Sequence, residues 1–390
     1  MKVDIDMALS AAVNKTQVPF VVAMVGNSRD ILYSNGYGDY GSWDRAEDTV
    51  FRIFSMTKAV GSLAAIILID RGLLGMHMPV ARYLPEWNDV RVIAGWDGDQ
   101  PILREPRREA TICNLATHTS GLEYELWSDD IQKYLEVTGH PSILSGTVES
   151  LNYPLTRDPN TRWAYGIGID WLTRVVEKVD GRPIDVFCQE EIFGPLGMTE
   201  TGFEPDQVPA KLAQVYARTE DGGFTPMDIA PPPNPEFYGM GHALYSTAAD
   251  YMKFLQMILN HGTLNGSTII STNACKLMRE NQLPATNPPL TFRKMVSVAP
   301  ALTDDFDPFP EAQLTHTFAF LRNEDAIADR RSEESLSWAG VCNTHYWIDP
   351  KEDLCAVIMT QLLPFVEPGF MQTYADFEKA VYYTYRGRKI

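Results

Sequence analysis

Residues 55–58 read Ser55-Met56-Thr57-Lys58 and lie between two apolar runs, Val50–Phe54 and Ala59–Leu73. The first run is typical of a short strand, and the second is typical of a buried helix. Positions three apart share one side of a helix, so the Lys58 amine can reach the Ser55 hydroxyl. A neutral lysine beside a serine can act as the base that activates the hydroxyl. The stretch therefore predicts a serine nucleophile at a strand-to-helix junction, where nucleophiles are often placed.

The composition is that of an ordinary globular protein, with 45% apolar and 22% charged residues. The 390 residues include 33 basic and 51 acidic ones, which gives a net charge of −18. This charge opposes binding to nucleic acid or to an anionic membrane, so we expect neither partner. We expect instead a small neutral or amphipathic molecule as the ligand. The composition leaves the oligomeric state open.

Several features favour a cytoplasmic protein without a metal or other cofactor. The segment Met1–Asp6 carries acids where a secretory signal has a basic start and an apolar run. No stretch approaches the roughly 18 apolar residues of a membrane span. The seven histidines form no pattern of metal ligands. Since no Cys-x-x-Cys pair occurs, we expect free, mostly buried thiols. The five cysteines are Cys113, Cys188, Cys275, Cys342 and Cys355.

Strand-like patterns occupy both ends of the chain, and helix-like patterns occupy the middle. This order predicts an α+β fold, with an antiparallel sheet built from both termini and flanked by helices. We expect a sheet domain of residues 1–75 and 285–390, with a mostly helical domain, 76–284, inserted into it. The expected strands are 18–25, 31–33, 317–321, 335–341, 345–348 and 355–359, and the expected helices are 57–72, 171–176, 184–193, 248–259 and 372–385.

Two segments read as surface loops, 231–235 and 281–307, because proline is frequent and no periodic pattern runs through them. The second is long for a connection without regular structure, and such loops are often binding lids. We expect residues 281–307 to border the cleft around Ser55 and to limit the size of the group bound there.

Two further stretches are candidates for the same site. In Trp163-Ala164-Tyr165-Gly166-Ile167-Gly168, a tyrosine in a glycine-rich turn before a helix could present its phenol to a cleft. The alternative is that Tyr165 is only a core aromatic. In Ser337-Trp338-Ala339-Gly340-Val341, a small residue and a glycine in a strand would let a ligand approach the backbone closely. The alternative is a bulge in an edge strand.

Together the three stretches resemble the serine β-lactamase and penicillin-binding-protein superfamily, in which a Ser-x-x-Lys motif carries the nucleophile. The resemblance is closest to the class C-like branch that includes the family VIII carboxylesterases. Four other segments, in the same order as in that branch, are similar to its turn, loop, helix-start and sheet motifs. They are residues 115–122, 193–198, 241–250 and 347–350.

The resemblance implies a β-lactamase-like fold and a site without a cofactor. Ser55 would be the nucleophile, with Lys58 and Tyr165 as its base network. The backbone N–H groups of Ser55 and Val341 would form the oxyanion hole, and the substrate would lie along Trp338, Ala339 and Gly340. His118, within the first similar segment, is expected to be a structural turn residue rather than a base.

Two positions depart from the lactamases. Their second motif, Tyr-x-Asn, ends in Ile167 here, and their third, Lys-Thr-Gly, begins with Trp338. These residues provide neither the amide nor the cation that helps a lactamase hold its substrate. The esterase branch carries a Trp-Gly-Gly-like triplet at the third motif and resembles this chain more. The resemblance therefore implies a carboxylesterase that acts on uncharged small-molecule esters through an acyl-enzyme.

Other functions stay open. They are an acyltransferase of the statin side-chain type, a β-lactamase or D-alanyl carboxypeptidase-like amidase, and an inactive binding protein on this fold. The joint presence of Ser55, Lys58 and Tyr165 argues against the inactive protein. No Gly-x-Ser-x-Gly occurs, which excludes the nucleophile elbow of an α/β-hydrolase. The natural ester, its acyl length and chirality, and the division of roles between Lys58 and Tyr165 are not determined by the sequence.

Trp338 should decide between esters and lactams. A cation at this position would pair with a lactam carboxylate, and such a charge-assisted contact is worth roughly 1.5–3 kcal/mol. We therefore predict that p-nitrophenyl butyrate is turned over with a higher kcat/KM than nitrocefin, measured at equal enzyme concentration. A kcat/KM for nitrocefin that equals or exceeds that for the ester would restore the lactamase interpretation.

Overall fold

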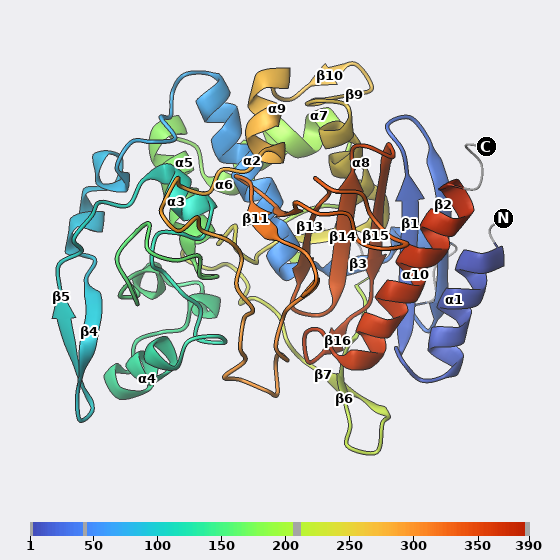
Figure 1. Ribbon diagram of the computed structural model, residues 1–390, viewed down its shortest axis with the longest axis horizontal. Coiled ribbons are helices and arrows are strands. Elements are labelled where there is room, and N and C mark those ends of the chain that lie inside the picture. Colours follow the sequence, from blue (N-terminus) through green and yellow to red (C-terminus); the bar gives the residue numbers. More distant parts are fainter. Residues whose placement is uncertain (1–2, 42–44, 206–211, 387–390) are drawn as a thin grey trace.

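The N-terminal hairpin and the C-terminal strands form one antiparallel sheet (Figure 1). The structure is a computed structural model that describes residues 3–41, 45–205 and 212–386. The sheet has the strand order β11-β12-β13-β14-β15-β1-β2, and β1 joins the two ends of the chain by pairing with β15. This confirms the predicted sheet. Its strands are β1 (Phe20–Gly26), β2 (Ile31–Gly38), β11 (Leu314–His316), β12 (Leu321–Asn323), β13 (Leu336–Gly340), β14 (Thr344–Asp349) and β15 (Leu354–Met359).

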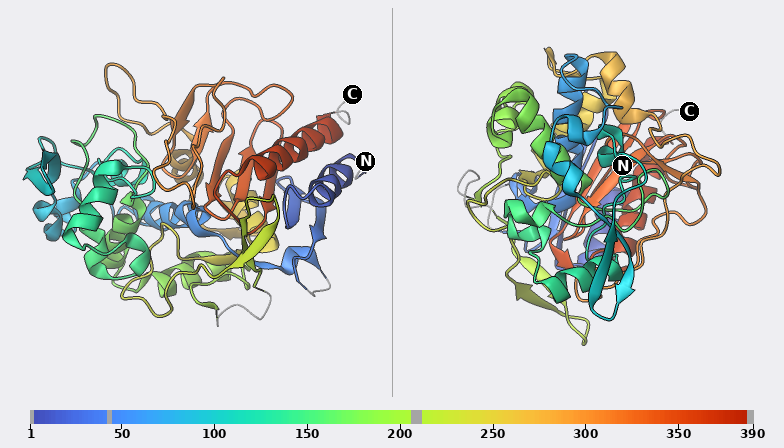
Figure 2. Two further views of the ribbon diagram at one scale, coloured as in Figure 1. Left: turned by 90° about the horizontal axis from the view of Figure 1, so that it is seen from below. Right: turned by 90° about the vertical axis from the view of Figure 1, so that its left-hand side faces the viewer.

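Helices cover both faces of this sheet. On one face, α1 (Val3–Asn14) and α10 (Pro368–Arg386) lie side by side, as Figure 1 and the left view of Figure 2 show. On the other face, α8 (Ala248–Leu259) packs against β1 and β15. Successive residues of a strand point to opposite faces, so Val21 and Ala23 pack with α1 and α10, while Val22 and Met24 join the larger core. Burial on both faces explains why β1 and β15 read as unbroken apolar runs.

Most of the remaining helices lie to the left of the sheet in Figure 1, and α7 and α9 lie near its top. The remaining helices are α2 (Thr57–Asp70), α3 (Ile112–Ala116), α4 (Asp129–Thr138), α5 (Gly168–Asp180), α6 (Ile184–Cys188), a π turn (Gln189–Phe193), α7 (Gly194–Leu196) and α9 (Thr272–Arg279). Smaller strand pairs and a three-stranded sheet accompany them. These are β3 (Val50–Arg52) with β8 (Tyr245–Thr247), β4 (Val92–Asp97) with β5 (Gln100–Arg104), β9 (Thr263–Leu264) with β10 (Ser267–Thr268), and β6 (Val215–Arg218) with β7 (Phe224–Met227) and β16 (Leu362–Leu363).

The predicted strand at 317–321 is wrong. Residues 317–320 form the turn between β11 and β12, and only Leu321 belongs to a strand. The Thr317 hydroxyl oxygen accepts hydrogen bonds from the backbone N–H groups of Ala319 (3.1 Å) and Phe320 (2.8 Å), which fixes the turn. Phe318 and Phe320 are nevertheless buried in the core. Their alternation with smaller residues imitates a strand, although it arises from a turn that packs inward.

The predicted helices are present, with shifted ends. Helix α2 ends at Asp70, and Gly72 follows with a φ of 71°, a conformation that glycine adopts easily. Helix α10 begins at Pro368, before the expected start at 372. Strand β8 and helix α8 fall inside the expected helical domain, yet β8 pairs with β3 and α8 packs on the sheet. The domain boundaries at 75/76 and 284/285 stay a prediction.

The cysteines agree with the expectation from their spacing, because all five are buried and unpaired. Within the described ranges, no helix has both the length and the apolar character needed to cross a bilayer. Among the same residues, no three His, Cys, Asp or Glu side chains are grouped closely enough to hold a metal ion.

Candidate active site

Ser55 lies in a strained turn between β3 and α2. The residue before it, Phe54, has a φ of 39°, which costs a bulky side chain of order 1–3 kcal/mol. Phe54 is held in place because its ring is buried in a cluster with Val215, Cys342 and Leu363. A 3₁₀ turn, Phe54–Met56, then runs directly into α2. The strain is maintained by packing and fixes the Ser55 hydroxyl at the start of the helix.

Strand β13 lies directly against this turn. A Cβ atom on Gly340 would lie 2.2 Å from the carbonyl oxygen of Ile53, so only glycine allows the approach. Val341 follows at the end of the strand and lines the same cavities as Ser55. The fold thus brings the third predicted stretch beside Ser55. The oxyanion role of the Ser55 and Val341 N–H groups stays a proposal.

Lys58 is buried on the first turn of α2. Its Nζ lies 3.1 Å from Ser55 Oγ, 2.9 Å from the Tyr124 hydroxyl and 2.7 Å from the carbonyl oxygen of Gly241. Burial lowers the pKa of Lys58 to about 7, although the nearby Asp170 carboxylate acts in the opposite direction. A neutral amine has two N–H groups for Tyr124 and Gly241, and its lone pair then faces the Ser55 hydroxyl. This geometry suits proton transfer from Ser55 to Lys58.

Tyr165 contacts Ser55 from the other side, and its hydroxyl donates a hydrogen bond of 2.8 Å to Ser55 Oγ. Burial raises the pKa of Tyr165, so the phenol keeps its proton at neutral pH. The two candidates therefore differ in what they can do. Lys58 can accept a proton, while Tyr165 can donate a hydrogen bond or pass a proton on.

Sequence reasoning missed Tyr124 and Asp170. Tyr124 follows the similar segment 115–122, and its backbone N–H donates to the carbonyl of Tyr165 at 3.1 Å. Asp170 is fully buried in the first turn of α5, where its Oδ1 accepts from the Gly241 N–H at 2.9 Å. The available sequence signal for Asp170 was an acidic residue at a core position of an amphipathic helix. Tyr124 gave no local signal, because its partner is 66 positions away.

His118 occupies a turn with a φ of 56° and is buried. Its ring packs against Tyr165 and Trp338, with centroids 4.9 and 6.3 Å away. Burial, with the neighbouring His316 and Lys58, lowers the pKa of His118 well below its usual range. The imidazole is therefore a neutral packed ring, in keeping with the expected structural role.

Two cavities meet at Ser55 and share Ser55, Trp127, Tyr165 and Val341. The first is narrow, with a volume of about 20 Å³. The second is larger, about 60 Å³. The first is also lined by Met295, Phe306, Trp338, Ala339 and Phe365, and the second by Phe54, Tyr124, Glu125, Leu126, Ile143, Leu144, Ile229, His242 and Leu302.

The segment 281–307 contributes to both cavities, which confirms that it borders the cleft. Met295 and Phe306 line the first cavity, and Leu302 lines the second. The segment is ordered by hydrogen bonds rather than by helices: Met295 and Phe306 exchange backbone hydrogen bonds of 3.0 and 2.9 Å. The backbone N–H of Asp304 donates to the Phe365 carbonyl, and the backbone N–H of Phe365 donates to the Leu302 carbonyl.

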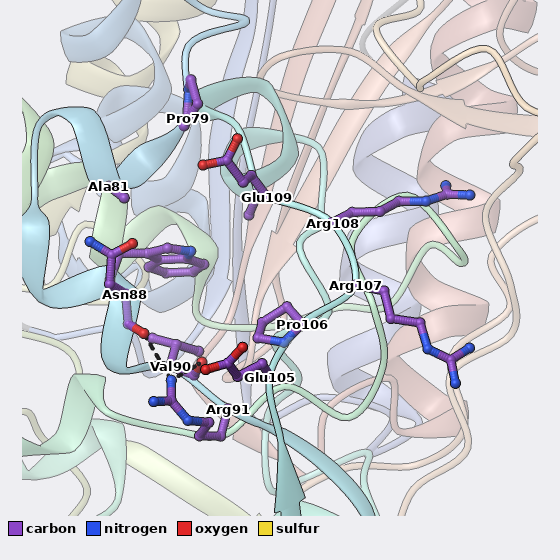
Figure 3. A pocket seen from close by; sticks show the side chains of 12 residues that line it. Pro79, Ala81, Asn88, Val90, Arg91, Glu105, Pro106, Arg107, Arg108 and Glu109 are labelled. Carbon is purple, nitrogen blue, oxygen red and sulfur yellow. Dashed lines mark hydrogen bonds between the residues drawn. The ribbon is translucent and has the colours of Figure 1, made fainter.

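A wider hollow of about 390 Å³ lies elsewhere and is lined by residues from the segment 79–110 (Figure 3). Its Arg91 donates to the carbonyl oxygens of Asn88 and Val90, so this guanidinium serves the local backbone. Arg107 and Arg108 extend together away from Arg91. Among the described residues that line this hollow, there is no serine, cysteine, histidine or lysine. The hollow offers no nucleophile–base pair, and Ser55 marks the candidate active site.

Comparisons with known proteins find similar proteins along almost the whole chain. The family model described as Beta-lactamase matches residues 5–380. The monacolin J acid methylbutanoyltransferase of Aspergillus terreus is 29% identical over 406 residues, covering 98% of this chain and 95% of the relative. The lovastatin esterase of Penicillium rubens is 28% identical over 326 residues, covering 80% and 79%. The unliganded structure of simvastatin synthase from Aspergillus terreus superposes with a TM-score of 0.83 at 26% identity, covering 98% of both chains.

The lowered pKa of Lys58 predicts the pH dependence of Ser55. The rate at which a fluorophosphonate labels Ser55 should rise with pH through about 7 and level off above it, because only the neutral amine accepts the proton. Asp170→Asn removes the charge that holds this pKa up, so its inflection should move to lower pH. Asp129→Asn, at an exposed position, is the control. An inflection that stays in place or rises in Asp170→Asn would contradict the assignment of Lys58 as the base.

Proposed function

This chain belongs to the beta-lactamase family, and we propose that it is a serine hydrolase that cleaves carboxylic esters through an acyl-enzyme on Ser55. The observation that carries the proposal is the position of Ser55 Oγ between a basic amine and a phenol, 3.1 Å from Lys58 Nζ and 2.8 Å from the Tyr165 hydroxyl. The lovastatin esterase among the relatives supports ester cleavage.

The proposed reaction follows from these contacts. Ser55 Oγ attacks the ester carbonyl as its proton moves to Lys58. The negative oxygen of the tetrahedral intermediate accepts hydrogen bonds from the N–H groups of Ser55 and Val341, and losing one such donor costs about 3 kcal/mol. Lys58 returns the proton to the departing alkoxide through the Tyr124 hydroxyl, which lies 2.9 Å from its Nζ, and the acyl group stays on Ser55. A water molecule, deprotonated by neutral Lys58, then releases the acid.

The cavities support a neutral, small-molecule substrate. Trp338 lines the first cavity where the lactamases carry a cation, and Met295 and Phe306 add apolar walls. The small volume of this cavity supports a short acyl group, with the segment 281–307 setting its length. The five buried, unpaired thiols support the cytoplasm as its compartment.

The second candidate is acyl transfer, in which an alcohol replaces water in the second step. Its specific support is the similarity to monacolin J acid methylbutanoyltransferase, which covers 98% of this chain. The apolar walls of both cavities also suit an organic acceptor better than water. The two functions share the acyl-enzyme and differ only in what attacks it.

Ser55→Ala should abolish turnover of p-nitrophenyl butyrate and labelling by a fluorophosphonate, because no acyl-enzyme can form. The fold should persist, since the hydroxyl contributes little to stability. Ser145→Ala, at an exposed position, is the matched control and should keep both activities. A label that maps to another serine, or turnover that survives in Ser55→Ala, would remove Ser55 as the nucleophile.

Product analysis in the presence of 1-butanol separates the two candidates. We expect butyric acid to be the main product of p-nitrophenyl butyrate cleavage if the chain is a hydrolase. Butyl butyrate in excess of butyric acid, at an alcohol concentration far below that of water, would overturn hydrolysis in favour of acyl transfer.

A further inference from the structure

The two cavities at Ser55 differ in chemistry. Among the described residues that line the first, Tyr165 is the one ionisable side chain. The second carries Tyr124, Glu125 and His242 in an otherwise largely apolar wall. An ester bound at Ser55 places its acyl group on one side and its alcohol on the other. The chemical difference between the cavities can therefore show which cavity takes which half of the ester.

The proton route identifies the alcohol side. The departing alkoxide must receive a proton from the Lys58 network. Tyr124 bonds to Lys58 Nζ at 2.9 Å and lines only the second of the two cavities, whereas Tyr165 lines both. The second cavity therefore faces the side on which the alcohol leaves or enters. The first, bounded by Trp338 and Ala339, takes the acyl group.

His242 can provide a hydrogen-bond acceptor in the second cavity. The residue is 6% exposed, and its Nδ1 lies 3.5 Å from Asp170 Oδ1 without a hydrogen bond among the described residues. The buried carboxylate favours a proton on Nδ1, so Nε2, on the opposite edge of the ring, is left as an acceptor. A Cβ atom on Gly239 would lie 2.8 Å from the His242 ring and 2.4 Å from Asp170, so glycine is needed there to seat the pair.

Glu125 supplies a second unfilled acceptor. Its Oε1 accepts a hydrogen bond of 2.5 Å from the Ser142 hydroxyl. Its Oε2 is buried and has no hydrogen-bond partner within the described part of the chain. Leaving a buried carboxylate oxygen unpaired is costly, and a ligand that donates to it recovers that energy. The side chains of Glu125 and His242 therefore both suit a ligand group that donates a hydrogen bond.

We propose that the second cavity binds an alcohol that carries a second hydrogen-bond donor, a hydroxyl or a protonated amine, held by Glu125 and His242. This inference rests on the proposed ester chemistry at Ser55. It makes Glu125 and His242 the residues that select among alcohols, while the first cavity selects the acyl group. The acidic net charge of −18 adds to the attraction for an amine.

The test compares butyrate esters of n-hexanol, 1,6-hexanediol and 6-aminohexanol, together with the monoesters of shorter diols and amino alcohols. At least one donor-bearing ester should exceed its alkyl counterpart by about tenfold or more in kcat/KM. Glu125→Met and His242→Leu should reduce that ratio toward one. Glu125→Gln keeps an acceptor but loses the charge, so it should lower the ratio for an amine much more than for a hydroxyl.

Glu136→Met, on the exposed side of α4, is the matched control and should leave the ratio unchanged. Fluorophosphonate labelling of Ser55 and a circular dichroism melt establish that each variant is folded and can form the covalent enzyme. Equal kcat/KM values for alkyl and donor-bearing esters in the parent protein overturn the inference. So does a preference that persists in both Glu125→Met and His242→Leu. If no ester is cleaved and Ser55 is not labelled, the proposed function fails instead.

Discussion

The rest of this site depends on one constraint, which is that the amine of Lys58 is buried away from water. Its three polar neighbours come from separate parts of the chain: Ser55 from the turn before α2, Tyr124 from a loop, and Gly241 from the segment before β8. The tertiary fold must be complete before the amine is enclosed. Enclosure in turn lowers the pKa of Lys58 to about 7 and makes it a base at neutral pH.

This arrangement destabilises the folded state, and apolar burial in the surrounding structure offsets the loss. A lysine whose pKa falls from 10.5 to about 7 destabilises the folded state by about 4 kcal/mol at pH 7, and the cost falls as pH rises toward 10. The positive φ of Phe54 adds strain next to Ser55. A sheet buried on both faces by α1, α10 and α8 provides the apolar burial that offsets these costs. The close approach at Gly340 then ties the sheet to the strained turn.

The parts of the fold and site that depend on local patterns were predictable from the sequence. The spacing of Ser55 and Lys58 follows from helix geometry, and the apolar runs at both ends predicted a shared sheet. Tyr124 and Asp170 were not predictable in this way, because their roles arise from contacts across 66 and 71 positions. The turn at 317–320 was mistaken for a strand because Phe318 and Phe320 are buried without being extended. The cavity roles of Glu125 and His242 also required the tertiary structure.

The most direct test of this account is the titration of Lys58 itself by NMR. In protein labelled with ¹³C at the lysine Cε, the Lys58 signal can be assigned by its loss in Lys58→Met and followed from pH 5 to pH 11. The account predicts a midpoint near pH 7, well separated from the ordinary lysines, which titrate near pH 10.4. A Lys58 signal that stays in its cationic form to pH 10 would contradict the central claim, because Ser55 would then have no base beside it at neutral pH.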